Sequence, residues 1–200
     1  MPSVQMDQTL VDRMVEKAIV YCADKNFNGN VKAAKKAFSE GRCDVCNYLI
    51  LNLVKQVSEY LGQMDKTVKA VYKFEPEHAT TRVQKEDEPI STRKSGINLI
   101  AWVERKSAAL SALVATLESS LAESRRKVGC KNAEPMCYAI SVGMVDDKDV
   151  FEERGYGAMV KAMYVRSSQV WARKDVADHT IPGKLTEEEL VKPLTAEFFD

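Results

Sequence analysis

The spacing of apolar residues changes its period near residue 65, and this change constrains the fold more than any other feature of the chain. Before it, apolar residues recur at helical spacing in three segments, which predicts a helical region over residues 1–64. Asp7 and Asn30 stand where helix N-caps are expected. The third segment has the most continuous apolar stripe: Cys46, Leu49, Ile50, Leu53, Val54, Val57 and Leu61.

After residue 65 the pattern becomes that of strands alternating with a helix. Residues 67–74 alternate and are rich in β-branched and aromatic residues, which predicts a strand, and 97–103 and 136–145 read as two further strands. Between the last two, residues 106–128 form a long helical pattern that ends in the basic run 125–127, where cations complement the helix dipole. Residues 157–174 fit either a helix or a strand, and both alternatives stay open.

These segments predict an α+β protein in which a helical N-terminal layer of three helices packs on a small mixed β-sheet with one long helix. The expected organisation is a helical region over 1–64, an α/β core over 65–176 and a tail with a short helix over 177–200. A length of 200 residues allows these parts to form one compact domain.

The charge balance limits the classes of partner. Twenty-nine basic and 29 acidic residues give a net charge of zero, which argues against a dedicated nucleic-acid partner. No apolar run approaches the ~20 residues that span a bilayer, so we expect no membrane partner. The N-terminus lacks the pattern of a signal peptide, and five cysteines are an odd number, so we expect a reducing, cytosolic location.

Cys43 and Cys46 form a C-x-x-C motif, the spacing of a redox pair or of half a zinc site. A zinc site needs two further ligands, for which Cys130 and Cys137 are the candidates. The structural alternative is that the thiols are unrelated, because Cys46 begins the apolar stripe of its helix and a buried cysteine behaves as a small hydrophobic residue.

An acidic residue and a lysine stand at the predicted end of the second strand, as Glu104-Arg105-Lys106. This triplet resembles the last part of the PD-(D/E)-x-K nuclease motif, and the resemblance implies a carboxylate that holds a metal and a lysine that stabilises charge on phosphate. Asp146 and Asp147 follow the third strand and could complete the set. The alternative is a solvated strand end.

The run Arg154-Gly155-Tyr156-Gly157 opens a helical pattern, where backbone N–H groups can face a phosphate. It resembles the pyrophosphate loop of the acetyl-CoA-dependent N-acetyltransferases. The resemblance implies binding of an acyl-CoA or another phosphate ligand at Arg154, Gly155 and Gly157. The alternative is an acidic surface turn.

No complete catalytic set, metal site or phosphate loop stands in the sequence, so whether the chain is an enzyme, and which cofactor it takes, stay open. We expect a non-catalytic binding or assembly protein. Small residues in the helix over 106–128 and the aromatic pair Phe198-Phe199 favour self-association as a homo-oligomer, and a protein partner is the other candidate.

Overall fold

The computed structural model describes residues 7–40, 47–74, 97–128, 140–161 and 168–176. The chain divides into two compact units, each assembled from separated stretches of sequence. Unit 1 contains residues 1–57, 95–97 and 107–140, and unit 2 contains residues 58–94, 98–106 and 141–200. The division into 1–64, 65–176 and 177–200 stays a prediction.

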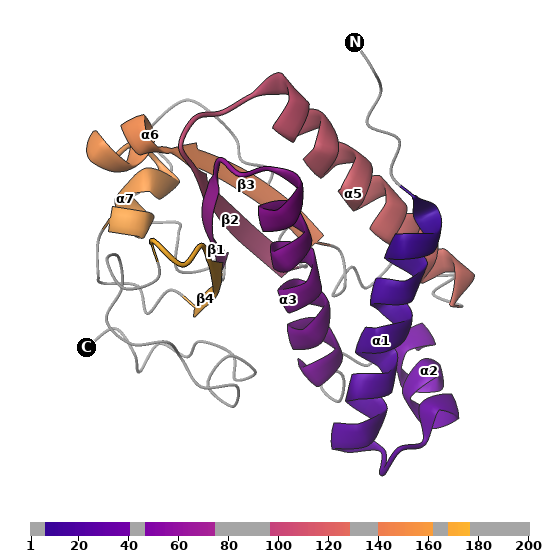
Figure 1. The fold of residues 1–200 in the computed structure, drawn as a ribbon. Helices are drawn as coiled ribbons and strands as arrows, with labels where there is room; N and C mark the ends of the chain where they lie inside the picture. The colour runs from indigo at the N-terminus through magenta and orange to yellow at the C-terminus, as the bar shows by residue number, and fades with distance from the viewer. Residues whose placement is uncertain (1–6, 41–46, 75–96, 129–139, 162–167, 177–200) are drawn as a thin grey trace, which may run out of the picture. The chain divides into compact units, whose positions relative to one another are not determined.

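Unit 1 is helical. It contains α1 (Gln8–Asn26), α2 (Val31–Ser39), α5 (Ala108–Lys127) and the first part of α3 (Asn47–Met64). Helix α1 packs against α2 and α5 (Figure 1). The helical spacing predicted from the sequence is confirmed, because the apolar residues that share one face of each helix are buried: Val11, Met14, Val15, Ala18, Ile19 and Cys22 of α1, and Leu110, Leu113, Val114, Leu117 and Leu121 of α5.

Both predicted N-caps of the first two helices are present. The Asp7 carboxylate accepts a hydrogen bond from the backbone N–H of Thr9, at 2.9 Å. The Asn30 side chain accepts one from the N–H of Ala33, at 3.1 Å. Each cap satisfies a backbone donor that the helix itself cannot pair.

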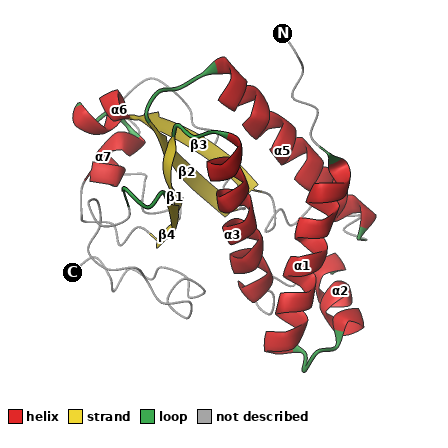
Figure 2. Ribbon diagram, viewed as in Figure 1, coloured by secondary structure: helices red, strands yellow, loops and turns green. Residues whose placement is uncertain are grey.

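Unit 2 is built on a four-stranded mixed sheet in the order β3-β2-β1-β4 (Figure 2). The strands are β1 (Val68–Phe74), β2 (Ile97–Val103), β3 (Ile140–Asp146) and β4 (Ser168–Ala172). Strand β1 is antiparallel to both β2 and β4. Its register with β2 shifts between Val68 and Ala70, so Lys69 is an extra residue there. Such a bulge redirects the side chain of the extra residue.

The short helix α7 (Tyr156–Lys161) packs Tyr156 and Val160 against one face of the sheet, and it contacts the short helix α6 (Asp147–Phe151). The buried cluster on this face consists of Ala70, Tyr72, Ile100, Trp102, Val145, Tyr156, Val160 and Val176. The segment 157–174, left open between helix and strand, contains both: most of α7 and then β4. The α+β class predicted from the sequence is confirmed.

Gly62, in the part of α3 that belongs to unit 2, lies against the indole ring of Trp171 in β4. A methyl group at this position would overlap three carbons of the ring. The missing side chain of Gly62 therefore makes room for Trp171.

Candidate functional site

The four cysteines of the predicted metal site, Cys43, Cys46, Cys130 and Cys137, lie outside the described residues, so zinc binding stays a prediction. Over the described ranges, no group of three or more His, Cys, Asp or Glu side chains is placed to hold a metal ion. Within the same ranges, no helix combines the length and hydropathy needed to cross a bilayer.

Two of the predicted acidic residues, Glu104 and Asp147, line one pocket of unit 2. The pocket has a volume of about 370 Å³, and we call it the sheet-end pocket. It is lined by Lys69, Trp102, Glu104, Asp147, Arg173, Asp175 and Val176. Antiparallel pairing brings these residues together: Glu104 N–H donates to the carbonyl of Thr67 at 2.9 Å, and Arg173 N–H donates to that of Lys69 at 2.8 Å.

The other two predicted catalytic residues serve neighbouring contacts. Asp146 caps α6, accepting from the N–H of Asp149 at 2.9 Å, in a reciprocal capping box. The Lys106 ammonium lies 2.8 Å from the Asp149 carboxylate. Burial by itself raises the pKa of Asp149, but the hydrogen bonds from Lys106 and from the Asp146 backbone outweigh it and hold the pKa below its ordinary value.

Lys69 lies between an aromatic ring and a carboxylate. Its ammonium is 4.2 Å from the centre of the Trp102 ring, a cation–π contact, and 2.8 Å from Asp147 Oδ1. The same oxygen accepts a hydrogen bond from Trp102 Nε1, also at 2.8 Å. The Lys69 side chain is only 18% exposed. These three contacts hold the side chains of Asp147, Lys69 and Trp102 against one another.

Arg173 makes the second polar group of the pocket. Its guanidinium forms a two-pronged pair with Asp175, at 2.7 Å from Nε to Oδ1 and 2.9 Å from Nη2 to Oδ2. Nη1 donates to Glu104 Oε1 at 2.9 Å and to the carbonyl of Lys66 at 2.7 Å. Hydrogen bonds to Asp175 and Glu104 raise the pKa of Arg173, and the same contact with Arg173 lowers the pKa of Asp175.

The remaining hydrogen-bonding capacity of the pocket is on its carboxylates. Four of the five guanidinium donors of Arg173 are used within the protein. Among the described residues, Glu104 Oε2 and Asp147 Oδ2 have no partner, and both side chains are 48% exposed. With three carboxylates and two cations in its wall, the pocket favours a positively charged group.

Sequence reasoning missed Lys69, Trp102, Arg173 and Asp175 as members of a site. The alternation of residues along a strand does not predict which way the Lys69 side chain points, because the register shift in β1 redirects it. The only local signal was Arg173-Lys174-Asp175, a run of three charged residues directly after the strand.

Local geometry accounts for the glycines of the predicted phosphate loop. Gly155 has φ +49°, a conformation that side chains disfavour, and a methyl group on Gly157 would overlap the backbone of Asp149. Gly157 N–H donates to the carbonyl of Arg154, and Arg154 N–H to that of Asp149, each at 2.8 Å. The Arg154 side chain pairs with Glu152 at 2.7 Å. Acyl-CoA binding here stays a prediction.

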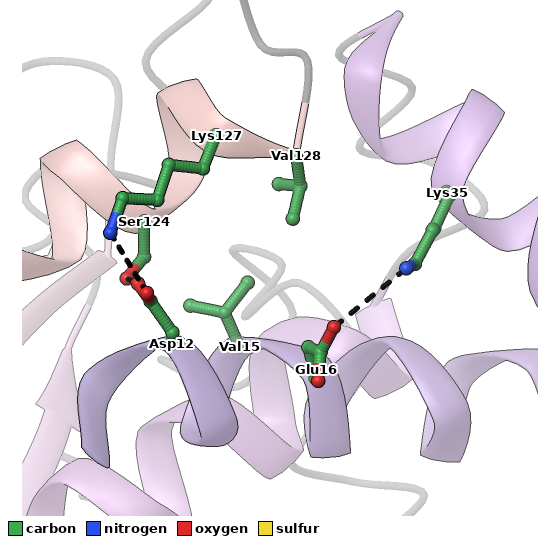
Figure 3. A pocket seen from close by; sticks show the side chains of 7 residues that line it. All are labelled: Asp12, Val15, Glu16, Lys35, Ser124, Lys127 and Val128. Carbon is green, nitrogen blue, oxygen red and sulfur yellow. Dashed lines mark hydrogen bonds and ion pairs between the residues drawn. The ribbon is translucent and has the colours of Figure 1, made fainter. Parts of the chain in front are cut away.

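Unit 1 has a pocket of its own, with a volume of about 470 Å³ (Figure 3). Figure 3 shows Lys127 and Ser124 of α5 reaching Asp12 of α1, and Lys35 of α2 turned toward Glu16. Lys127 Nζ is 2.9 Å from Asp12 Oδ2, whereas Lys35 and Glu16 are 3.9 Å apart. The wall of the unit 1 pocket therefore carries one close ion pair, Lys127–Asp12, and one longer pair, Lys35–Glu16.

Asp12 is the centre of the contact between α1 and α5. It accepts hydrogen bonds from Lys127, Ser124 and Gln8, which lower the pKa of Asp12 to about 2. Gln8 also donates to Ser124 Oγ at 2.9 Å and to the carbonyl of Ser120 at 3.0 Å. A carboxylate with so low a pKa is a poor general base, so this cluster is a structural clamp between the two helices.

Comparison with known proteins assigns no relative to the chain. No protein-family model, curated protein sequence or solved structure matches it. The candidate function therefore rests on the geometry of the sheet-end pocket.

Proposed function

We propose that the protein is a cytosolic, non-catalytic binding protein whose sheet-end pocket takes a positively charged group of its partner. The observation that carries the proposal is the hydrogen-bonding capacity left in the pocket: Glu104 Oε2 and Asp147 Oδ2 are acceptors, while most donors of Arg173 are already paired. An ammonium or guanidinium group supplies the missing donors and balances the excess of carboxylates. The odd number of cysteines supports the cytosolic location.

The indole N–H of Trp102 provides a direct test, because it donates to the carboxylate that the ligand is proposed to contact. The probe is N-acetyl-arginine amide, and N-acetyl-norleucine amide is its uncharged control. We expect the arginine compound, at millimolar concentration, to shift the Trp102 indole signal in a ¹⁵N NMR spectrum. The only other tryptophan, Trp171, should shift little and serves as an internal reference.

Charge-neutralising variants then assign the effect to the pocket. Glu104→Gln and Asp147→Asn should each weaken binding about tenfold, since each removes one charge-assisted hydrogen bond. Glu59→Gln, at an exposed carboxylate of α3 outside the pocket, is the matched control and should leave binding unchanged. Equal shifts with the charged and uncharged probes would contradict the proposal.

Metal-dependent phosphodiester cleavage is the second candidate, and one observation favours it: Glu104 and Asp147 line the same pocket. Both carboxylates are already paired with cations, and Lys106 is paired with Asp149. A divalent ion would therefore compete with Lys69 and Arg173 for these two carboxylates. Saturable binding of Mg²⁺ or Mn²⁺ below about 1 mM, lost in Asp147→Asn, would support this second candidate over the first.

Self-association remains part of the proposed role, with a second protein as the alternative partner. The exposed apolar side chains of the described residues, which include Met64 and Phe151, are compatible with either. Light scattering of the full chain at high concentration distinguishes a homo-oligomer from a monomer.

A further inference from the structure

Phe151 is the most exposed large apolar side chain among the described residues, at 81%. It is the last residue of α6, and Asp147 of the sheet-end pocket is the first. Residues four positions apart in an α-helix lie on the same face, with Cβ atoms about 5–6 Å apart. An exposed aromatic ring therefore stands beside the wall of a pocket that favours a cation.

The surroundings of Phe151 are acidic. Residues 146–154 contain five carboxylates and two cations, Lys148 and Arg154. Arg154 pairs with Glu152 at 2.7 Å, Lys106 with Asp149 at 2.8 Å and Lys69 with Asp147 at 2.8 Å. Five carboxylates therefore stand against four cations, and one negative charge remains in excess. A surface with an apolar centre and negative flanks is complementary to a segment that carries both basic and apolar side chains.

We infer that the partner is an extended protein segment that places an arginine or lysine in the sheet-end pocket and an apolar side chain against Phe151. The inference rests on the proposed function and extends it from a charged group to a peptide. In an extended segment, residues i and i+2 point to the same side and lie about 6.5 Å apart, close to the roughly 5–6 Å between Cβ atoms of helix positions four apart, such as Asp147 and Phe151. The expected pattern is therefore basic-x-apolar.

Two acetylated tripeptide amides test this pattern, Arg-Gly-Leu and Arg-Gly-Ser. We expect Arg-Gly-Leu to bind about tenfold more tightly, because only its leucine can bury apolar surface against Phe151. Phe151→Ser should remove this advantage and leave the affinity for Arg-Gly-Ser unchanged. Since Phe151 is so exposed, the substitution should not disturb folding, which the far-UV circular dichroism spectrum checks.

Each outcome decides between the two proposals. If both peptides bind equally to the unmodified chain, the peptide inference is wrong and the cation-binding function stands. An advantage for Arg-Gly-Leu that survives in Phe151→Ser also overturns the inference. If neither peptide shifts the Trp102 indole signal, the proposed function fails together with the inference.

Discussion

The contact between Gly62 and Trp171 predicts that Gly62→Ala destabilises the protein, although alanine is the better helix former. In an exposed helix, replacing glycine by alanine stabilises by about 1 kcal/mol. Here the new methyl group would overlap three indole carbons, the farthest only 2.8 Å away. Carbon atoms at van der Waals contact are about 3.5–4.0 Å apart, so the ring or the helix must move.

Overpacking of this kind costs about 1–3 kcal/mol. After the propensity gain is subtracted, we expect Gly62→Ala to lower the free energy of unfolding by about 1 kcal/mol. For a chain of 200 residues this corresponds to a fall in Tm of about 2–4 °C. Urea denaturation followed by circular dichroism measures the free energy, and differential scanning calorimetry measures the Tm.

The sign of the effect is the test, because helix propensity and the steric contact predict opposite signs. Trp171→Leu provides the matched background, since it removes the ring that the methyl group would overlap. In that background Gly62→Ala should become neutral or stabilising. A rise in stability on Gly62→Ala in the unmodified chain would refute the contact between α3 and β4 described above.

Two further predictions concern Asp12 and the two glycines at the start of α7, Gly155 and Gly157. Because the pKa of Asp12 is lowered from 3.8 to about 2, its contribution to stability is present above pH 4 and is lost as the pH falls toward 2. The Asp12 side chain is 35% exposed, so solvent screening reduces the effect. Asp12→Asn should lower the free energy of unfolding, measured by urea denaturation, by about 1 kcal/mol at pH 6 and by little at pH 2. An equal loss at both pH values would contradict the role of Asp12 in joining α1 and α5. Gly157→Ala should lower the Tm clearly more than Gly155→Asn, because the first overlaps the Asp149 backbone whereas asparagine tolerates the positive φ of the second; thermal melts of the two variants, compared with the parent chain, check the order.

Most of the helices and strands could be predicted because local patterns determine them, whereas α6 had no predicted counterpart and the segment of α7 and β4 stayed open between helix and strand. The apolar faces of α1 and α5 follow the helical period, and Asp7 and Asn30 cap helices through bonds to residues two or three positions away. Strand β2 begins and ends where its apolar run does, at Ile97 and Val103. Such signals depend on neighbours in the sequence, so one sequence is enough to read them.

The candidate site was only half predictable, because long-range pairing assembles it. Glu104 and Asp147 could be proposed from their positions after apolar strands, but their neighbours could not. Arg173 and Glu104 are 69 positions apart, and Lys69 and Asp147 are 78 apart. Local periodicity contains no information on which strands are neighbours, and the register shift at Lys69 breaks the alternation on which a strand prediction relies.

Unit 1 is assembled from segments that are far apart in the sequence, so the time at which it can fold depends on when the ribosome makes each segment. Gln8 and Ser124 touch across 116 positions of sequence. At about 5–20 residues per second, the ribosome adds that length in roughly 6–23 s. During this interval α1 has emerged without the helix that completes its apolar face. Unit 1 therefore cannot finish folding until the residues of α5 have been synthesised.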